Sequence, residues 1–258
     1  MAMALEFRNL TKQFATNSGA VLTAIRDVTF TVNTGEFVSV VGPSGCGKST
    51  LLSMTAGLYQ PTSGEVLVSG EPVNGPNDHV GFMLQKDLLL PWRNIVSNIE
   101  FGLESRPGSK AERRERAMFE LRRCHLDGFE HQYPYQLSGG MRQRAALART
   151  LAIDPEIILL DEPFSALDAQ TKLLLQNSFA ETIAESGKTT LLITHDLAEA
   201  VLMSDRIFVL SERPGQIVAE IRVDLPNRNH PLKRRMMPEV ADYASQLFRH
   251  LKLEEKAI

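Results

Sequence analysis

The chain has 258 residues, 43% of them hydrophobic and 23% charged, an ordinary composition for a soluble globular protein. This length suits one large domain or a domain with a sizeable insert. The formal net charge of −3 gives no reason to expect general nucleic-acid binding. Cys46 and Cys124 are too few for a disulfide framework, which fits a reducing cytosol. We find no signal pattern and no apolar run that could cross a bilayer, so we expect a partner to bring the chain to any membrane.

The first part of the chain predicts strands that lead into a glycine-rich loop. Alternating apolar residues near Leu5 and Phe7 and over residues 28–32 predict strands, and residues 37–41 predict a short buried strand. The loop follows, and then a helix that Gly57 is placed to end. Another short strand is predicted at residues 65–68.

The glycine-rich loop fits the phosphate-loop pattern G-x-x-x-x-G-K-[ST], with a strand before it and a helix after it. Its glycines let backbone N–H groups turn toward phosphate oxygens at the positive end of the helix dipole. We predict that Lys48 reaches the outer phosphates and that the Ser49 hydroxyl is a ligand of Mg²⁺. An ordinary glycine-rich turn is the alternative that this context disfavours. The predicted nucleotide-binding residues are Gly42, Pro43, Ser44, Gly45, Cys46, Gly47, Lys48, Ser49 and Thr50.

From about residue 87 the pattern becomes helical. Apolar residues recur at helical spacing over residues 95–103. Residues 109–112 match a capping box that opens a strongly charged helix, and Ala117 and Leu121 belong to its narrow apolar stripe. These features predict a helical insert between strands.

Residues 137–141 open another helix of this insert. Ser138 is a good N-cap, and Gly139 and Gly140 leave bare N–H groups at the positive end of the helix dipole. This makes a second anion site, although the phosphate loop already surrounds one triphosphate. We infer that the helix end binds the nucleotide held by a second copy of the chain, so that a two-fold dimer buries two ATP molecules. A plain capped helix is the competing interpretation.

Strand patterns resume in the last third of the chain. Residues 157–160, 189–193, 207–210 and 217–221 predict strands, with a helical segment that Gly187 closes between the first two. Strands that alternate with helices predict a mostly parallel α/β sheet with the phosphate site at its carboxyl edge. The chain ends in a predicted amphipathic helix that begins near Pro238 and continues to about Leu251.

Polar side chains follow two of these strands. Asp161 and Glu162 end a buried strand, where a phosphate-loop enzyme holds its Mg²⁺ with an Asp. A second carboxylate beside that ligand can orient or deprotonate the attacking water. His195 ends another strand, within reach of the γ-phosphate or the attacking water. The alternatives are a polar strand exit for the two acids and a structural role for the histidine.

Together these residues closely resemble the ATP-binding subunits of ABC transporters over about residues 5 to 215. The phosphate loop, Gln85, residues 137–141, the Asp161-Glu162 pair, residues 165–168 and His195 occur in the order and approximate spacing of that family. The resemblance implies an ATPase with bound ATP and Mg²⁺, on an α/β, RecA-like P-loop NTPase fold with an N-terminal antiparallel β region. The parts that it implies are a core of residues 1–86 and 153–215, a helical subdomain of residues 87–152 and a C-terminal extension of residues 216–258.

The resemblance also implies roles for residues outside the loop. Phe14 would stack on adenine, where the family often has Tyr. Gln85 would contact Mg²⁺ and the attacking water. Asp168 would belong to the loop that passes between the two ATP sites, while Glu162 would be the general base and His195 the switch residue.

The signature of the family would be Ser138, Gly139, Gly140 and Met141, which would contact ATP across the dimer. Met141 replaces the Gln that is commonest in this motif. Ser138 and the backbone can still serve the phosphate, so we expect function to survive this replacement.

A finer resemblance links the chain to importers of nitrate, sulfonates and taurine, through residues 85–92, the signature that ends in Met141, and residues 213–215. It implies a peripheral place at the cytoplasmic face of the membrane, transmembrane permease subunits as partners, and an extracytoplasmic solute-binding protein. Residues 88–92 form an apolar patch that either docks a helix of the permease or belongs to the core of the insert. Trp92 and Arg93 favour docking, because these side chain types are enriched at interfaces.

Two other classes of protein remain as alternatives. Soluble ABC ATPases of DNA repair or translation usually carry two cassettes or a long coiled coil, and this sequence has neither. A phosphate-loop GTPase or kinase would leave residues 137–141 unexplained, and the guanine motif Asn-Lys-x-Asp is missing. Residues 233–235 are three basic residues in a polar linker, which predicts a solvated run, with lipid headgroups as the alternative contact.

Overall fold

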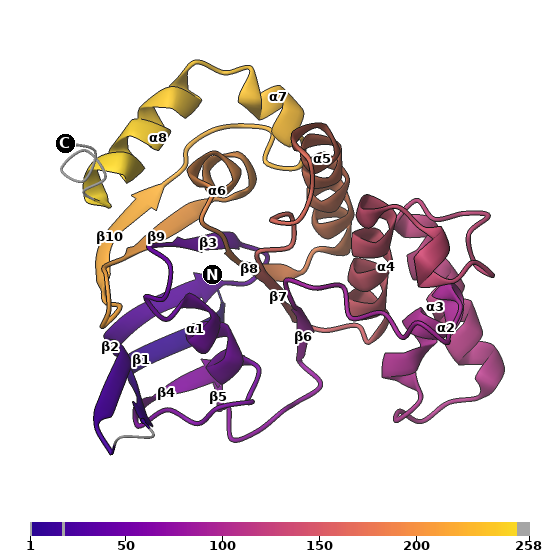
Figure 1. The fold of residues 1–258 in the computed structure, drawn as a ribbon, viewed down its shortest axis with the longest axis horizontal. Coiled ribbons are helices and arrows are strands. Elements are labelled where there is room, and N and C mark those ends of the chain that lie inside the picture. Colours follow the sequence, from indigo (N-terminus) through magenta and orange to yellow (C-terminus); the bar gives the residue numbers. More distant parts are fainter. Residues whose placement is uncertain (1, 17–18, 252–258) are drawn as a thin grey trace.

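Two sheets lie at the centre of the structure, a computed structural model that describes residues 2–16 and 19–251 (Figure 1). The six-stranded sheet has the order β10-β9-β3-β8-β7-β6, and every neighbouring pair in it is parallel except β10 and β9. The predicted mostly parallel α/β sheet is therefore confirmed. Its strands are β3 (Phe37–Val41), β6 (Val80–Met83), β7 (Ile157–Asp161), β8 (Thr189–Ile193), β9 (Arg206–Leu210) and β10 (Ile217–Arg222).

The second sheet is antiparallel and has the order β2-β1-β4-β5, which confirms the predicted N-terminal β region. Phe7 and Phe30 face each other across β1 and β2 with ring centroids 4.3 Å apart, and Phe30 lies equally close to Phe208 of the main sheet. One buried apolar cluster therefore joins both sheets with the helix α1 (Lys48–Thr55). The strands are β1 (Met3–Ala15), β2 (Val21–Asn33), β4 (Ser63–Val68) and β5 (Glu71–Pro72).

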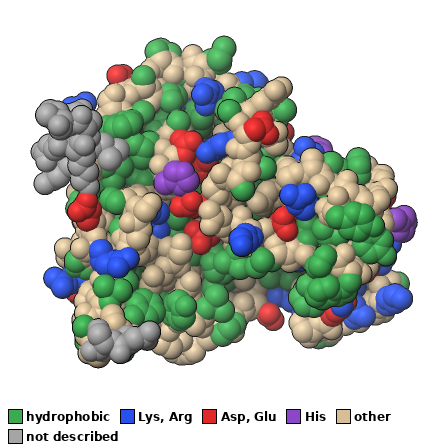
Figure 2. Space-filling model, in the orientation of Figure 1, with side chains coloured by type: hydrophobic (Ala, Val, Ile, Leu, Met, Phe, Trp, Pro, Cys, Tyr) green, Lys and Arg blue, Asp and Glu red, His purple; other side chains and the backbone are tan. Residues whose placement is uncertain are grey.

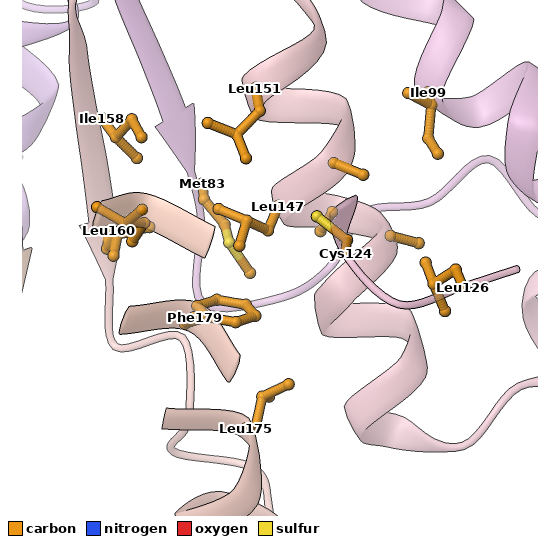
Figure 3. Packing of buried hydrophobic residues seen from close by; sticks show 14 of the residues in the cluster. Met83, Ile99, Cys124, Leu126, Leu147, Leu151, Ile158, Leu160, Leu175 and Phe179 are labelled. Atoms are coloured by element: carbon orange, nitrogen blue, oxygen red, sulfur yellow. The ribbon is translucent and has the colours of Figure 1, made fainter. Parts of the chain in front are cut away.

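A group of helices lies to the right of the main sheet in Figure 1. The capping box predicted at its longest charged helix is present, because Ser109 and Glu112 each accept a hydrogen bond from the backbone N–H of the other. Figure 3 shows that the core of this group is continuous with the sheet: Leu147 of the helices lies beside Met83 of β6, and Leu160 of β7 belongs to the same cluster. The members are α2 (Ile95–Glu100), η1 (Phe101–Leu103), α3 (Lys110–Arg123), η2 (Pro134–Gln136) and α4 (Gly139–Ala152).

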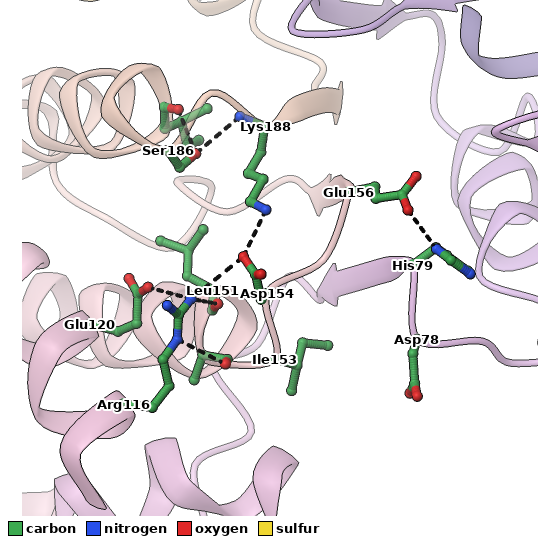
Figure 4. Close-up of polar contacts among 12 residues, drawn as sticks. Asp78, His79, Arg116, Glu120, Leu151, Ile153, Asp154, Glu156, Ser186 and Lys188 are labelled. Atoms are coloured by element: carbon green, nitrogen blue, oxygen red, sulfur yellow. Dashed lines mark hydrogen bonds and ion pairs between the residues drawn. The ribbon is translucent and has the colours of Figure 1, made fainter. Parts of the chain in front are cut away.

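Polar contacts of Arg116 join two helices of this group to each other (Figure 4). Arg116 of α3 donates to the carbonyl oxygens of Leu151 and Ala152 at the end of α4, at 3.0 and 3.2 Å. The same guanidinium lies 2.7 Å from a carboxylate oxygen of the buried Glu120. Arg116 thus supplies donors and positive charge to the C-terminal end of α4, where the last carbonyl groups lack helical partners.

The remaining helices lie on the side of the main sheet opposite to α1 (Figure 1). Their bounds are α5 (Ala169–Ser186), α6 (Leu197–Met203), α7 (Pro231–Arg235) and α8 (Glu239–His250). The sequence patterns indicated α5 and α8 but neither α6 nor α7, which are too short for helical periodicity to be visible. None of the described helices is long and apolar enough to cross a membrane.

The division of the chain into a core, a helical subdomain and a C-terminal extension stays a prediction. Across the predicted boundary between residues 215 and 216, β10 pairs with β9, so residues after the boundary complete the main sheet. α8 contributes Leu247 to a buried cluster with Val41 and Val201. The extension is therefore packed on the core through a shared apolar cluster.

The prediction that residues 233–235 form a solvated basic run is wrong for its middle residue. Arg234 is only 1% exposed. Its guanidinium donates to the carbonyl oxygens of Val201 and Ser204 at 3.0 and 2.8 Å, and also to Leu225 and Pro226. Burial is favourable here because the side chain supplies donors to the C-terminal carbonyl groups of α6, which lack helical partners.

We predict that Arg234→Met lowers the free energy of unfolding by about 2–4 kcal/mol, because it leaves several buried carbonyl groups without donors. Arg235→Met is the matched control, since Arg235 is exposed on the same helix, and it should change stability by less than about 0.5 kcal/mol. Urea denaturation followed by circular dichroism without nucleotide measures both. Equal effects of the two substitutions would contradict the structural role of Arg234.

Candidate active site

A cavity of about 300 Å³ opens beside the loop between β3 and α1. Its lining brings together segments that are far apart in the sequence, including the N-terminal sheet, the glycine-rich loop and the end of β7. Eight of the predicted site residues lie in it, together with Leu22, Ala24 and Arg213. The eight are Phe14, Ser44, Gly45, Gly47, Lys48, Ser49, Thr50 and Glu162.

The glycine-rich loop has a conformation that requires glycine at two positions. Gly45 and Gly47 have φ angles of 75° and 106°. A Cβ atom on Gly47 would lie 2.4 Å from Cγ2 of Ile25, so β2 packs directly against the loop backbone. Lys48 is 6% exposed, and its ammonium donates to the carbonyl oxygens of Gly42 and Pro43 at 2.7 and 3.0 Å. The loop therefore encloses its own lysine.

The side chain of Cys46 points away from the cavity. It is 1% exposed and belongs to the apolar cluster between the two sheets. Burial raises the pKa of this thiol, against the opposing positive charges of Lys48 and Arg213. Cys46 thus contributes its backbone to the loop, while its thiol serves packing.

Two oxygen-bearing side chains converge at the edge of this loop. The Ser49 hydroxyl donates to Oδ1 of Asp161 at 3.2 Å. Burial raises the pKa of Asp161, and the charge of Glu162 adds to the effect, whereas the Ser49 bond and Lys48 oppose it. A hydroxyl and a destabilised carboxylate this close fit a hard divalent cation such as Mg²⁺, which prefers oxygen ligands and would stabilise the charged carboxylate.

Glu162 and His195 form a pair at the ends of β7 and β8. Nδ1 of His195 lies 2.9 Å from Oε2 of Glu162. Glu162 has a φ of 46°, and its backbone N–H donates to the carbonyl of Ile193 at 2.9 Å, which fixes the turn after β7. Figure 2 shows acidic side chains around a histidine near the middle of the face drawn there, with basic side chains beside them. The two strand ends meet because β7 and β8 are adjacent parallel strands that share one carboxyl edge.

Gln85 lies outside the lining of the cavity. Its Nε2 donates to the Ser165 hydroxyl at 3.1 Å, and that hydroxyl donates to the backbone carbonyl of Glu162 at 2.9 Å. Gln85 is therefore connected to the acidic strand end through Ser165 rather than through Ser49 and Asp161.

The segment around Gln85 is held by α4. Gln143 donates to the carbonyl oxygen of Gln85 at 3.3 Å, and Arg149 donates to those of Asp87 and Leu88 at 2.6 and 2.8 Å. Burial lowers the pKa of Arg149, and the charge of Asp87 opposes this effect. α4, which begins at the predicted signature, thus holds the segment beside Gln85 through these hydrogen bonds.

The start of α4 is not part of the cavity. Ser138 is exposed and accepts a hydrogen bond from the backbone N–H of Met141 at 3.3 Å, so the predicted N-cap is present. Gly139 and Gly140 lie at the first positions of this helix. Asp168 likewise caps α5, by accepting from the N–H of Thr171 at 3.0 Å. The structure therefore separates Ser138, Gly139, Gly140, Met141 and Asp168 from the cavity of their own chain.

Sequence reasoning missed three residues of the lining, namely Leu22, Ala24 and Arg213. The N-terminal pair belongs to β2, which no short motif marks as part of a site. Arg213 lies in the turn between β9 and β10, and its place in the site follows from the strand order rather than from a short motif. Because β9 runs parallel to β3, the residues that follow both strands meet at the same edge of the sheet.

Comparisons with known proteins agree with this geometry. The sequence profile of the family described as ABC transporter matches residues 25–165. A taurine import ATP-binding protein of Yersinia pestis is 46% identical over 80% of this chain and 80% of its own length. A nitrate import ATP-binding protein of Synechocystis is 41% identical over 95% of this chain and 94% of its own.

A solved structure is also similar to most of the chain. It is a dimeric ATP-binding cassette in a post-hydrolysis state, bound to ADP and Pi. It is 33% identical, has a TM-score of 0.74, and matches 86% of this chain and 99% of its own. The family profile and the long, closely similar relatives show that the chain belongs to the ABC transporter family, as an ATP-binding subunit that hydrolyses ATP.

Proposed function

We propose that two copies of this chain enclose two ATP molecules and that their hydrolysis powers uptake of a small solute through a separate membrane permease. One observation carries the proposal. The N-terminus of α4, capped by the exposed Ser138, lies outside the cavity of its own chain. A helix N-terminus suits an anion, so we infer that a second copy brings this end to the nucleotide. The dimeric state of the similar cassette with ADP and Pi supports this arrangement.

ATP binding begins with the aromatic wall of the cavity. The half-buried Phe14 has its ring 5.7 Å from that of Tyr59 and 5.0 Å from the ammonium of Lys12, contacts that hold it in place for stacking on adenine. The backbone N–H groups of residues 42–50 bind the phosphates, and Lys48 moves from the loop carbonyls to the outer phosphates.

We assign the Mg²⁺ site to Ser49 and Asp161, with Gln85 as a further ligand once ATP is bound. When bound there, Mg²⁺ neutralises negative charge on the phosphates. The raised pKa of Asp161 and its contact with the Ser49 hydroxyl support this assignment. Gln85 has to leave its bond with Ser165 to reach this place.

The proposed hydrolysis uses Glu162 and His195, the pair at the ends of β7 and β8. Glu162 accepts a proton from a water molecule, whose oxygen attacks the γ-phosphorus in line as the bond to the bridging oxygen breaks and ADP leaves. Nδ1 of His195, 2.9 Å from the Glu162 carboxylate, keeps that carboxylate oriented, and the ring reaches the γ-phosphate. Lys48 and the α4 end of the second copy stabilise the charge that develops on the phosphoryl oxygens.

The membrane partner would bind beside Gln85. Leu88 and Trp92 are 53% and 72% exposed, whereas Leu89 between them is buried at 7%. The apolar patch of residues 88–92 thus has one buried side chain and two exposed ones. Such a patch suits docking of a short helix from a permease. We therefore place the protein at the cytoplasmic face of the membrane, peripherally attached through this contact.

The class of solute is proposed from relatives alone. Proteins named as taurine and nitrate importers are 46% and 41% identical to the chain over most of its length. A cytosolic ATPase does not touch the solute, so residues of this chain carry no direct information about it. We infer an importer for small anions or zwitterions of the nitrate, sulfonate or taurine type, with an extracytoplasmic solute-binding protein.

We predict that Glu162→Gln lowers the rate of ATP hydrolysis at least about 100-fold, because the amide cannot accept the proton of the attacking water. ATP binding should persist, and ATP should trap a dimer that size-exclusion chromatography detects. Glu71→Gln is the control, since Glu71 is exposed on the edge strand β5. Undiminished hydrolysis in Glu162→Gln would contradict the role given to this carboxylate.

The composite site is tested in the background of Glu162→Gln. We predict that adding Ser138→Arg abolishes the ATP-dependent dimer, because a bulky cation blocks the N–H groups at the start of α4. Ser109→Arg is a matched control: Ser109 also caps an exposed helix start, so both substitutions lose about 1 kcal/mol of capping. Light scattering with ATP should report monomers for the Ser138 variant and dimers for the Ser109 variant. Dimers in both would contradict the shared site.

The transported solute is identified through the partners. We expect the chain to co-purify with its membrane permease, and the solute-binding protein of the same system to gain thermal stability with its solute. A thermal-shift screen against nitrate, sulfonates and taurine measures this. Failure of the chain to co-purify with any membrane protein would favour a soluble ATPase instead.

A further inference from the structure

Arg213 is the charged residue of the cavity lining to which no motif assigns a role. It follows β9 in the turn that leads to β10, and it lines the same cavity as the phosphate loop. Lys48 and Arg213 are the two cationic residues of that lining. Because Lys48 is buried in the loop while Arg213 is exposed, the second positive charge faces the open side of the cavity.

The guanidinium of Arg213 is attached to the phosphate loop itself. Nε and Nη2 both donate to the carbonyl oxygen of Gly45, at 2.9 and 2.7 Å. A Cβ on Gly45 would lie 3.0 Å from Nη2, so the charged group sits directly against the loop. Its other N–H groups have no hydrogen-bond partner within the part of the chain that the structure describes, and they remain available to a ligand.

The turn that carries Arg213 is held in place by its neighbours. The N–H of Gly215 donates to the carbonyl of Ala24 at 2.9 Å, and its own carbonyl accepts from the N–H of Arg26 at 3.0 Å. A Cβ on Gly215 would lie 2.1 Å from the carbonyl oxygen of Cys46. The backbone of the turn is therefore packed against the backbones of β2 and the phosphate loop. This packing fixes the backbone position from which the Arg213 side chain extends.

We propose that Arg213 is a phosphate-binding residue of this site. It holds Gly45 by the carbonyl and presents the rest of its guanidinium to the phosphates of a bound nucleotide. The planar, permanently charged group forms strong, directional hydrogen bonds with phosphate oxygens. This inference rests on the proposed ATP site, and it adds a cation from the β9–β10 turn to the phosphate loop.

The test separates the charge of Arg213 from its support of the loop. Arg213→Gln removes the charge but keeps an N–H donor for the Gly45 carbonyl, while Arg213→Lys keeps the charge. Arg222→Gln is the matched control, because the Arg222 side chain is 83% exposed on β10, away from the cavity lining. Dissociation constants are measured for adenosine, AMP and ADP by competition with a fluorescent ADP, which requires neither hydrolysis nor a dimer.

We expect Arg213→Gln to weaken ADP binding about tenfold, to weaken AMP binding less, and to leave adenosine binding unchanged. Arg213→Lys should stay within about threefold of the unchanged protein for ADP, and Arg222→Gln should match it for all three ligands. Equal weakening of all three ligands by Arg213→Gln would mean that Arg213 only supports the loop, and no weakening would mean that it has neither role. Both results overturn the inference.

Failure of the proposed function would give a different result in the same experiment. If the unchanged protein binds ADP no more tightly than adenosine, the phosphate site itself is wrong. If it discriminates between them and Arg213→Gln retains that discrimination, only the role of Arg213 is wrong. Circular dichroism melting curves without nucleotide verify that every variant is folded.

Discussion

Close packing of backbone against backbone at the phosphate loop is the constraint on which the site depends. Gly47 leaves no room for a Cβ beside Ile25, and Gly215 leaves none beside the carbonyl of Cys46. Three segments that are distant in the sequence therefore share one small volume, with the Cys46 side chain filling the core beneath them. The loop is therefore supported from below by β2 and from the side by the β9–β10 turn, and such support favours a preorganised site.

The parallel sheet explains why Glu162 and His195 lie together and why Ser138, at the start of α4, lies apart from them. Glu162 and His195 meet because β7 and β8 are adjacent parallel strands that end at the same edge. Ser138 begins a helix of the lateral group instead, and its N-terminus faces outward. One chain thus holds a phosphate loop with an acid and a histidine, while the capped start of α4 lies apart from them.

Short patterns in the sequence correctly predicted several local features of the fold. The capping box at Ser109, the Ser138 cap and the turn at Gly57 each depend on a few consecutive residues, and each is present. The short strand β6 was missed, because four residues that include a glycine give little periodicity. Non-local packing was also invisible: nothing near Arg234 in the sequence reveals that α6 needs its donors.

The candidate site also contains both residues that a short sequence pattern reveals and residues that only the fold brings together. Residues of the phosphate loop, Asp161 and Glu162 were recognisable because their chemistry is bound to a short pattern. The contact of Gln85 with Ser165 and the contact of Arg213 with Gly45 join residues 80 and 168 positions apart. Such contacts depend on strand order, and a single sequence does not specify that β9 lies next to β3.

If the chain binds a permease and shares its ATP site as proposed, α4 offers a physical route between the two. Arg149 and Gln143 of α4 hold the backbone of the segment that carries Gln85 and the exposed Leu88, while Ser138 caps the N-terminus of the same helix. A helix of 14 residues is stiff, and Arg116 of α3 binds its C-terminal carbonyl groups, so these parts move together. Under the proposed function, a permease helix that displaces Leu88 therefore also displaces the Ser138 end. The proposed motion of Ser138 to the nucleotide of a second copy would in turn shift the docking patch, since binding free energies at coupled sites act in both directions.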